Sequence, residues 1–253
     1  MAEAMRKRTE RAGEGRATPA AVVPKPGRPK GERHYRRARH DRGAETRQRL
    51  VEAALDVFGR YGFEGATTRQ IAKEAKANLA AIVYHFGSKE ALHVAVAEYL
   101  AGRIATLIGP TLAAAAAPEA TATPQSARAA LTRLLETYAD VLLGEKEAER
   151  WARFIVREQM QPTAAFEVIY RTMGGAHGIG ARLVAAILGR SPDDEAVKLG
   201  VFTLLGQILV FRVAREMVLR RMGWRTIGDK ERAAIKRVVI AQTNAILDHA
   251  VLP

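Results

Sequence analysis

Between residues 67 and 90 the chain carries polar and basic side chains whose types and spacing suit the binding of a nucleic-acid duplex. Thr67, Thr68, Arg69, Lys76 and Lys89 surround a short apolar segment. Hydroxyl, guanidinium and ammonium groups of this kind bind phosphate oxygens, and such contacts set the register of a protein on DNA without reading its sequence. These five residues are therefore expected to contact the phosphate backbone.

The apolar segment inside this frame has features suited to contact with base edges. Ala80 and Ala81 are small and would let a helix backbone come close to a groove, while Tyr84 and His85 follow one turn later and can donate hydrogen bonds or stack. Contacts with base edges are the ones that specify sequence. The pattern predicts a reading helix that begins after Asn78.

Two preceding helices are predicted to position this segment. An apolar stripe with helical spacing ends at Gly62, a typical stop for a helix, and Gly65 permits a turn. Thr67 and Gln70 have the spacing of a capping box, which predicts a second helix over residues 68–75. The residues of the first stripe are Leu50, Ala54, Val57, Phe58 and Tyr61.

The third and fourth helices also have clear start and stop signals. Asn78 is expected to cap a helix from Leu79 to about His85, Gly87 to end it, and Ser88 to cap a helix that runs to about residue 108. The second helix is expected to bury the face formed by Ile71, Ala72 and Ala75. The third helix is expected to bury the face formed by Leu79, Ile82 and Val83. Two short helices joined by a three-residue turn and braced by a third present one helix to a DNA major groove.

About 50 residues of this region resemble the DNA-binding domain of the TetR family, in order and spacing. The matching residues are Thr46-Arg47, Ala53-Ala54, Phe58, Tyr61-Gly62-Phe63, Thr67-Thr68, Ile71-Ala72, Tyr84-His85-Phe86 and Ser88-Lys89-Glu90-Ala91-Leu92. The resemblance implies a three-helix DNA-binding domain followed by a larger helical domain that binds a ligand and dimerises.

Matching positions carry the family's roles onto this chain. Thr68 and Lys89 would anchor phosphates at helix N-termini, and Phe86 would be a core residue. Lys76 stands where the family usually has glycine in the turn, Ala77 is smaller than usual, and Asn78 replaces a common serine. The expected DNA-binding residues are Arg47, Thr67, Thr68, Arg69, Lys76, Asn78, Leu79, Ala80, Tyr84, His85 and Lys89.

The second half of the chain is similar to the C-terminal domain of the CecR-type subgroup of that family. The similarity lies in residues 154–166 and in Ile169-Tyr170, and residues 78–82 of the reading helix share it. It implies a regulator of export or drug-sensitivity genes, and it does not identify an inducer. Polar or aromatic side chains within apolar helices are the candidates for the effector site: Phe154, Arg157, Glu158, Phe166, Tyr170, His177, Gln207 and Phe211. Each of them could equally be a core or surface residue.

A dimer is expected because one short reading helix covers too few base pairs, and two copies can read half-sites one helical turn apart in an inverted-repeat operator. The last two long helices would then form a four-helix bundle with those of a second copy. The interface candidates, any of which could instead be core, are Val201, Leu205, Ile208, Leu209, Val213, Ile235, Val238, Val239, Gln242 and Ile246.

The basic charge of the chain is concentrated at its N-terminus. Of a net charge of +13, residues 1–42 hold 13 Lys and Arg against 5 Asp and Glu. This segment lacks apolar periodicity and is predicted to be a disordered tail. Residues 26–30 resemble the Gly-Arg-Pro core of an AT-hook, which enters the minor groove of A·T-rich DNA. A plain basic tail, which need not contact DNA, remains the alternative.

A 3.6-residue apolar period that recurs from Ala44 onward predicts an all-α protein, and the composition fits a cytoplasmic one. The 253 residues are 48% hydrophobic and include no cysteine, which excludes disulfides and thiolate metal sites. The longest apolar run, residues 199–211, is too short to span a membrane. The expected domains are the tail (1–42), a DNA-binding domain (43–92, with the helix-turn-helix at about 67–87) and a helical ligand-binding and dimerisation domain (93–253). Prolines predict a loop at 109–126, followed by helices at 127–144, 147–160, 163–173, 176–189, 194–222 and 229–250.

Two other classes of protein, an enzyme and a ligand-independent DNA-binding protein, fit the sequence less well. Glu90 and His93 have the E-x-x-H spacing of di-iron carboxylate bundles, but it occurs once where two copies are needed. The glycine-rich residues 174–180 do not follow a strand, so they do not predict a nucleotide site. No catalytic residue, metal or cofactor is therefore expected. A ligand-independent or architectural DNA-binding protein is the second alternative, which the tail favours and the large apolar second domain disfavours.

Overall fold

A computed structural model describes residues 30–249 of the chain, with side chains from residue 42 onward. The chain divides into two compact units, residues 1–41 and residues 42–253. In the first unit, the backbone is helical from Lys30, where α1 (Lys30–Gly65) begins. The predicted disorder is therefore wrong for residues 30–42, where arginine, alanine and glutamate favour helix once Pro29 has been passed. Residues 26–29 of the AT-hook-like motif lie outside the described residues.

Three helices with short connections follow the predicted pattern in the N-terminal part of the second unit. Gly62 interrupts α1 with φ 74° and ψ 176°, which confirms the predicted stop. Helices α2 (Thr68–Glu74) and α3 (Leu79–Phe86) come next. Leu50, Ala54, Val57 and Phe58 of the predicted stripe are buried, but Tyr61, at the last turn before the interruption, is half exposed.

Helix α4 (Lys89–Ala116) is longer than predicted because it continues through Pro110. The predicted loop at 109–126 is therefore wrong for most of its length, since η1 (Pro118–Thr121) and α5 (Pro124–Gly144) occupy the remainder. Proline removes one backbone hydrogen bond from a helix. The alanine run, which favours helix, offsets this loss. Packing also stabilises this part of α4, because Ala115 is buried and Thr111 Oγ1 lies 3.2 Å from Thr137 Oγ1 of α5.

The remaining helices are α6 (Ala148–Met160), α7 (Phe166–Leu188), α8 (Glu195–Val213), α9 (Arg215–Met222) and α10 (Asp229–Asp248). Helix α7 joins two predicted helices across Gly174-Gly175, because the buried residues on both sides hold the chain helical there. Conversely, a single helix predicted at 194–222 divides at Ala214 into α8 and α9. No strand occurs among residues 30–249, which confirms the all-α prediction.

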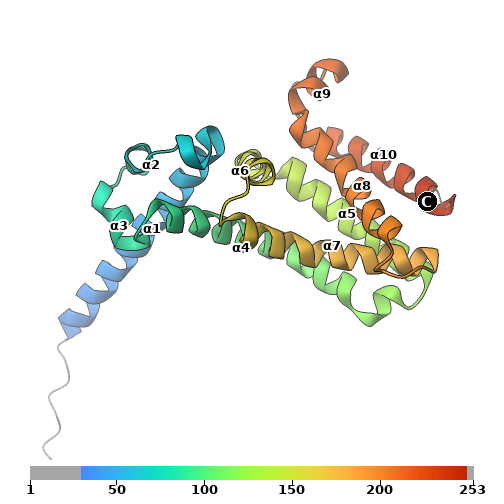
Figure 1. The fold of residues 1–253 in the computed structure, drawn as a ribbon, viewed down its shortest axis with the longest axis horizontal. Coiled ribbons are helices and arrows are strands. Elements are labelled where there is room, and N and C mark those ends of the chain that lie inside the picture. The colour runs from blue at the N-terminus through green and yellow to red at the C-terminus, as the bar shows by residue number, and fades with distance from the viewer. Residues whose placement is uncertain (1–29, 250–253) are drawn as a thin grey trace, which may run out of the picture. The chain divides into compact units, whose positions relative to one another are not determined.

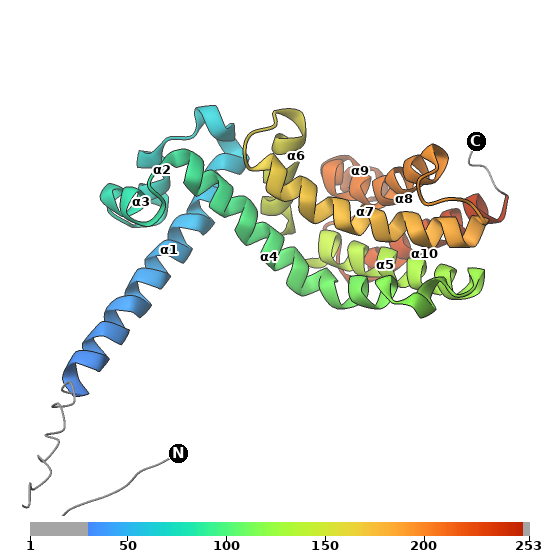
Figure 2. The same cartoon turned by 60° about the horizontal axis from the view of Figure 1, so that its bottom comes forward.

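The second unit contains two apolar cores that share helix α4. The first core is built from α1–α3, the start of α4, α6 and the first turn of α7. The second core lies among α4, η1, α5, α7, α8 and α10. Leu92 and Leu100 of α4 belong to the first core, and Ile108 and Ala115 belong to the second. Helices α4 and α7 lie side by side (Figures 1 and 2), so that both elements connect the two cores.

Helices α4 and α8 satisfy the length and apolar composition of a membrane-spanning helix, although the sequence predicts no such segment. Both contribute side chains to the cores, including Leu100 of α4 and Ile208 of α8. In each helix 33% of the apolar window is buried, so packing within the chain accounts for part of this composition.

Candidate nucleic-acid interface

Helix α2 begins with the predicted capping box. Thr67 Oγ1 accepts a hydrogen bond from the Gln70 backbone N–H at 3.2 Å, and Gln70 Oε1 accepts one from the Thr67 N–H at 2.9 Å. Two backbone donors at the start of the helix are thereby satisfied. Ile71 is buried as predicted, whereas Arg69 is exposed and Thr68 is half-buried.

The turn between α2 and α3 is closed by a lysine in the left-handed region. Among the described residues, Lys76 is the one non-glycine residue with a positive φ, which is 49°. Its N–H donates to the Lys73 carbonyl at 3.1 Å, and the Ala77 N–H donates to the Ala72 carbonyl at 2.9 Å. This conformation costs about 1 kcal/mol in a non-glycine residue, and it leaves the Lys76 side chain exposed beside α3.

Helix α3 is anchored by Ile82, which is only 1% exposed, and capped by Asn78, whose Oδ1 accepts from the Ala80 N–H at 2.9 Å. Leu79 and Val83 were expected to be buried, and this expectation is wrong: they are 42% and 66% exposed. A helix of eight residues turns a single row of side chains toward the core, and Ile82 occupies it. Tyr84 is 79% exposed, as a reading residue requires.

The C-terminal end of α3 meets a cation from α1. The Tyr84 and His85 rings are in edge contact, with centroids 4.9 Å apart, and the Arg47 guanidinium lies 5.1 Å from the centroid of the Phe86 ring. His85 and Phe86 are half-buried, and Phe86 packs against the first core as the family resemblance implies. Arg47 is exposed, so its charge is available next to the exposed end of α3.

Lys89 has a different environment from the exposed cations. Its Nζ donates to the Phe63 carbonyl at 2.9 Å and to the Ala66 carbonyl at 3.2 Å, and it lies 4.3 Å from the centroid of the Phe63 ring. Two of the three ammonium N–H groups are therefore used within the chain. Lys89 fastens the start of α4 to the segment between α1 and α2.

These contacts make α3 a rigid helix with an exposed, uncharged face of Leu79, Ala80, Val83 and Tyr84. The sequence of α3 contains no carboxylate, and the exposed cations Arg47, Arg69 and Lys76 come from the elements around it. A B-DNA major groove is wide enough to admit one helix, and its edges are lined by phosphates. The arrangement suits a helix inserted between two phosphate backbones.

A buried polar cluster lies behind this region, where α4 meets α6. His93 and Glu158 are each 3% exposed, with 3.5 Å between Nε2 and Oε1. Thr163 Oγ1 donates to Glu158 Oε2 at 2.9 Å and lies 3.2 Å from His93 Nδ1. Burial, and secondarily the positive charge of Lys89, lowers the pKa of His93 to about 4. The imidazole is therefore neutral near pH 7, and Glu90 of the E-x-x-H pattern takes no part in the cluster.

Helix α6 is bound to α1 by two arginines that the sequence did not single out for this role. Arg150 donates to Asp56 Oδ1 at 2.7 Å and to the Glu52 carbonyl at 2.9 Å. Arg157 donates to the Gly59 carbonyl at 2.8 Å and to the Arg60 carbonyl at 2.6 Å. Their seven-residue spacing, which places both on one face of a helix, was the signal available in the sequence.

The residues proposed for an effector site are not brought together. Phe154 and Glu158 are buried in the first core, so they are packing residues and not the walls of a cavity. The other pairs lie apart from them: Phe166 stacks on Tyr170, and His177 contacts Phe202. Gln207 and Phe211 of α8 are half-buried, and the Gln207 Oε1 atom is buried without a hydrogen-bond partner.

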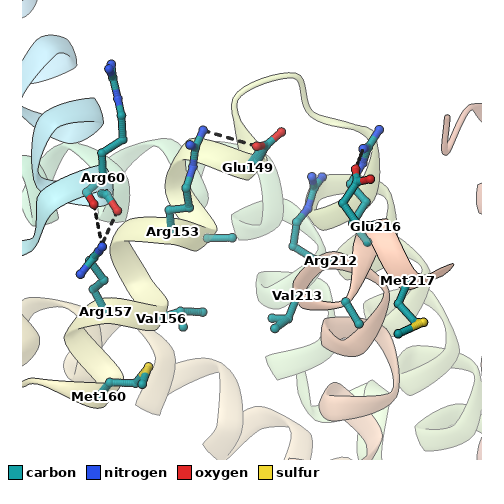
Figure 3. A pocket seen from close by; sticks show the side chains of 14 residues that line it. Arg60, Glu149, Arg153, Val156, Arg157, Met160, Arg212, Val213, Glu216 and Met217 are labelled. Carbon is teal, nitrogen blue, oxygen red and sulfur yellow. Dashed lines mark hydrogen bonds and ion pairs between the residues drawn. The ribbon is translucent and has the colours of Figure 1, made fainter. Parts of the chain in front are cut away.

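The second unit contains a small void and a larger groove. A void of about 10 Å³ lies between α4, α6 and α7, lined by apolar residues and Thr172. A groove of about 770 Å³ lies between α6 and the junction of α8 with α9 (Figure 3). Of the predicted effector residues, only Arg157 lines this groove.

The predicted dimer residues divide into two sets. Val201, Ile208, Ile235 and Val239 are at most 5% exposed and lie in the second core, so they cannot contact a second copy. Leu205 and Ile246 are half-buried against the same core. The four that remain exposed are Leu209, Val213, Val238 and Gln242. Further exposed apolar residues on α8 are Leu199, Phe202 and Val210.

Comparison with known proteins gives two family matches and a relative that aligns over most of both chains. Residues 50–96 match the family of bacterial regulatory proteins named tetR, and residues 127–249 match the C-terminal domain of the HTH-type transcriptional dual regulator CecR. The dual regulator CecR of Shigella flexneri is 36% identical over 210 residues, which are 81% of this chain and 93% of that protein.

Solved structures share the fold at low sequence identity. A transcriptional regulator of Pseudomonas aeruginosa PAO1 aligns with a TM-score of 0.59 at 18% identity, over 81% of this chain and 91% of that one. AibR, solved in complex with isovaleryl coenzyme A and operator DNA, aligns with a TM-score of 0.58 at 14% identity, over 78% of this chain and 97% of its own. With its full-length similarity to CecR, the chain belongs to the TetR family of bacterial transcriptional regulators.

Proposed function

We propose that this TetR-family regulator is a cytoplasmic homodimeric repressor that binds an inverted-repeat operator and is released from it by a small molecule. The observation that carries the proposal is the geometry of α3. Ile82 holds the helix on the first core, while Leu79, Val83 and Tyr84 face solvent. Three large apolar or aromatic side chains on one exposed face are unfavourable in water, and a groove lined with base edges and thymine methyl groups would cover them.

The phosphate contacts in this proposal come from the exposed cations and the helix starts around α3. The side chains of Arg47, Arg69 and Lys76 are exposed. Thr67 caps the N-terminus of α2, and Thr68 is the first residue of that helix. Helix N-termini and arginines bind phosphate oxygens and fix the orientation of the reading helix.

The dimer would form through the outer faces of α8 and α10. Phe202 and Leu209 lie seven residues apart on α8 and are 61% and 36% exposed. Val238 is 51% exposed on α10. Isologous packing of these two helices with their copies would cover an apolar face and place two α3 helices on one duplex.

Selection of bound fragments from a random duplex pool tests the proposal. We expect one inverted repeat, bound about 4–10 kcal/mol more tightly than unrelated DNA. Tyr84→Ala should weaken operator binding in a gel shift, while Tyr170→Ala, which removes another exposed tyrosine from α7, should leave it unchanged. Equal binding to all fragments would indicate an architectural protein instead.

A further inference from the structure

The groove between α6 and the α8–α9 junction has the size of a small-molecule site. Its volume of about 770 Å³ is within the range of about 300–1,000 Å³ common for ligand pockets. Figure 3 shows Val156 of α6 and Val213 of α8 facing each other across it. Met160 and Met217 extend the apolar walls on the two sides.

The rim of the groove carries an excess of positive charge. Five arginines and two glutamates line it: Arg60, Arg153, Arg157, Arg212, Arg215, Glu149 and Glu216. Both glutamates already have a partner, because Glu149 lies 3.4 Å from Arg153 and Glu216 lies 3.4 Å from Arg215. These two glutamates therefore do not balance the positive charges of the other arginines on the rim.

Arg157 and Arg212 are the two that lack a carboxylate partner within ion-pairing distance among the described residues. Arg157 donates only to the carbonyls of Gly59 and Arg60. Arg212 is half-buried, and its Nε and Nη2 both donate to the Leu142 carbonyl. Burial lowers the pKa of Arg212, and the nearby Glu149 carboxylate offsets part of this effect without forming an ion pair with it. A buried charge of this kind is stabilised by a counter-ion.

We propose that this groove binds an amphipathic organic anion, with its apolar body between Val156 and Val213 and its charged head at Arg157 and Arg212. This proposal rests on the proposed function, since it assigns the chemical class of the effector. The paired glutamates of the rim disfavour a cation, and the unpaired guanidinium groups disfavour a purely apolar ligand.

Arg157 gives the site a connection to the DNA-binding helices. It lines the groove and at the same time holds the carbonyls of Gly59 and Arg60 at the end of α1. A guanidinium can form two parallel hydrogen bonds with an anionic head group, in addition to their charge attraction. An anion in the groove therefore competes for Arg157 and loosens α6 from α1.

A matched pair of fluorescent probes tests the site in the full-length protein without DNA. Anilinonaphthalene sulfonate and N-phenylnaphthylamine share an aromatic body, and only the first carries a negative charge. We expect one sulfonate-sensitive site per chain, with affinity for the anion at least about tenfold higher than for the neutral probe. Equal affinity for the two probes would overturn the proposal.

Variants place the binding in the groove. Val156→Trp should fill it and abolish binding of the anion, and Arg212→Gln should weaken binding several-fold without affecting the neutral probe. Arg133→Gln, on an exposed position of α5 outside the groove, is the matched control. Circular dichroism confirms that each variant is folded. Unchanged binding in both groove variants would overturn the proposal.

A second measurement tests coupling to DNA with the selected duplex. The anion should lower operator affinity in the wild-type protein and have no effect in Val156→Trp. Binding in the groove without a change in DNA affinity would overturn the assignment as effector site. Because the probe titration contains no DNA, its failure leaves the proposed DNA binding intact, and loss of operator binding in Tyr84→Ala is measured without the probe.

Discussion

Replacing Lys89 with methionine distinguishes a structural lysine from a phosphate contact. The family resemblance implies that Lys89 anchors a phosphate, but its Nζ donates to the carbonyls of Phe63 and Ala66. Methionine keeps an apolar stem of similar length over the Phe63 ring and removes the charge and its hydrogen bonds. Lys73, exposed on α2, offers the matched control Lys73→Met.

The expected loss of stability follows from the two hydrogen bonds. A hydrogen bond from a charged group contributes about 1.5–3 kcal/mol. Lys89 is half-buried, so the lower end of this range applies to each bond, partly offset by water reaching the freed carbonyls. We expect Lys89→Met to lower the free energy of unfolding by about 2–3 kcal/mol, which in a chain of this size corresponds to a fall in Tm of roughly 5–10 °C.

Thermal unfolding and the salt dependence of operator binding together decide the question. With a structural role, Lys89→Met lowers Tm by the stated amount, and the slope of log K against log salt stays within error of the wild type. With a phosphate contact, the magnitude of that slope decreases by about one. An unchanged Tm together with a smaller slope would refute the structural reasoning. Lys73→Met should leave Tm unchanged.

Three further predictions concern the first core, the reading helix and the dimer interface. Because burial lowers the pKa of His93 to about 4, the unfolded chain binds a proton between about pH 6.5 and 4 that the folded chain does not. The free energy of unfolding should therefore fall by up to about 3 kcal/mol as pH decreases through that window. Denaturant titrations of His93→Phe should show a smaller fall. Ile82→Ala should cost about 2–5 kcal/mol by the same titration, whereas Val83→Ala, at an exposed neighbour, should change stability little. Val238→Glu should produce monomers in sedimentation velocity, and Val83→Glu should remain dimeric while losing operator binding; a dimeric Val238→Glu would contradict the proposed interface.

Features encoded within a few residues could be predicted from the sequence. The capping box of Thr67 and Gln70, the caps at Asn78 and Ser88, and the interruption at Gly62 each depend on residues at most four positions apart. Local hydrogen bonds decide such features, so the start and end of α2 and α3 followed from residue type and spacing.

Features that depend on distant partners could not be predicted in this way. Whether Leu79 and Val83 face solvent depends on how much of α3 the first core covers, and that core contacts Ile82 and Phe86 instead. Lys89 contacts carbonyls 23 and 26 residues earlier in the chain. Helix α4 continues through Pro110 because α5 packs against its far end, and nothing in residues 109–116 alone reveals that neighbour.

Helix α6 has two faces with different partners, and this arrangement determines how its movement can reach the DNA-binding helices. Its inner face carries Phe154, buried in the first core, between Arg150 and Arg157, which both bind α1.

Shifting α6 while α1 stays in place would break four hydrogen bonds from charged groups, each of which contributes about 1.5–3 kcal/mol. Moving the two helices together preserves those four bonds. Since α1 also carries Arg47, whose guanidinium lies over Phe86 at the end of α3, a shift of α6 that leaves the arginines bound must change the position of the reading helix. An anion that draws Arg157 into the groove removes half of these bonds and leaves α1 held to α6 only through Arg150 and the core.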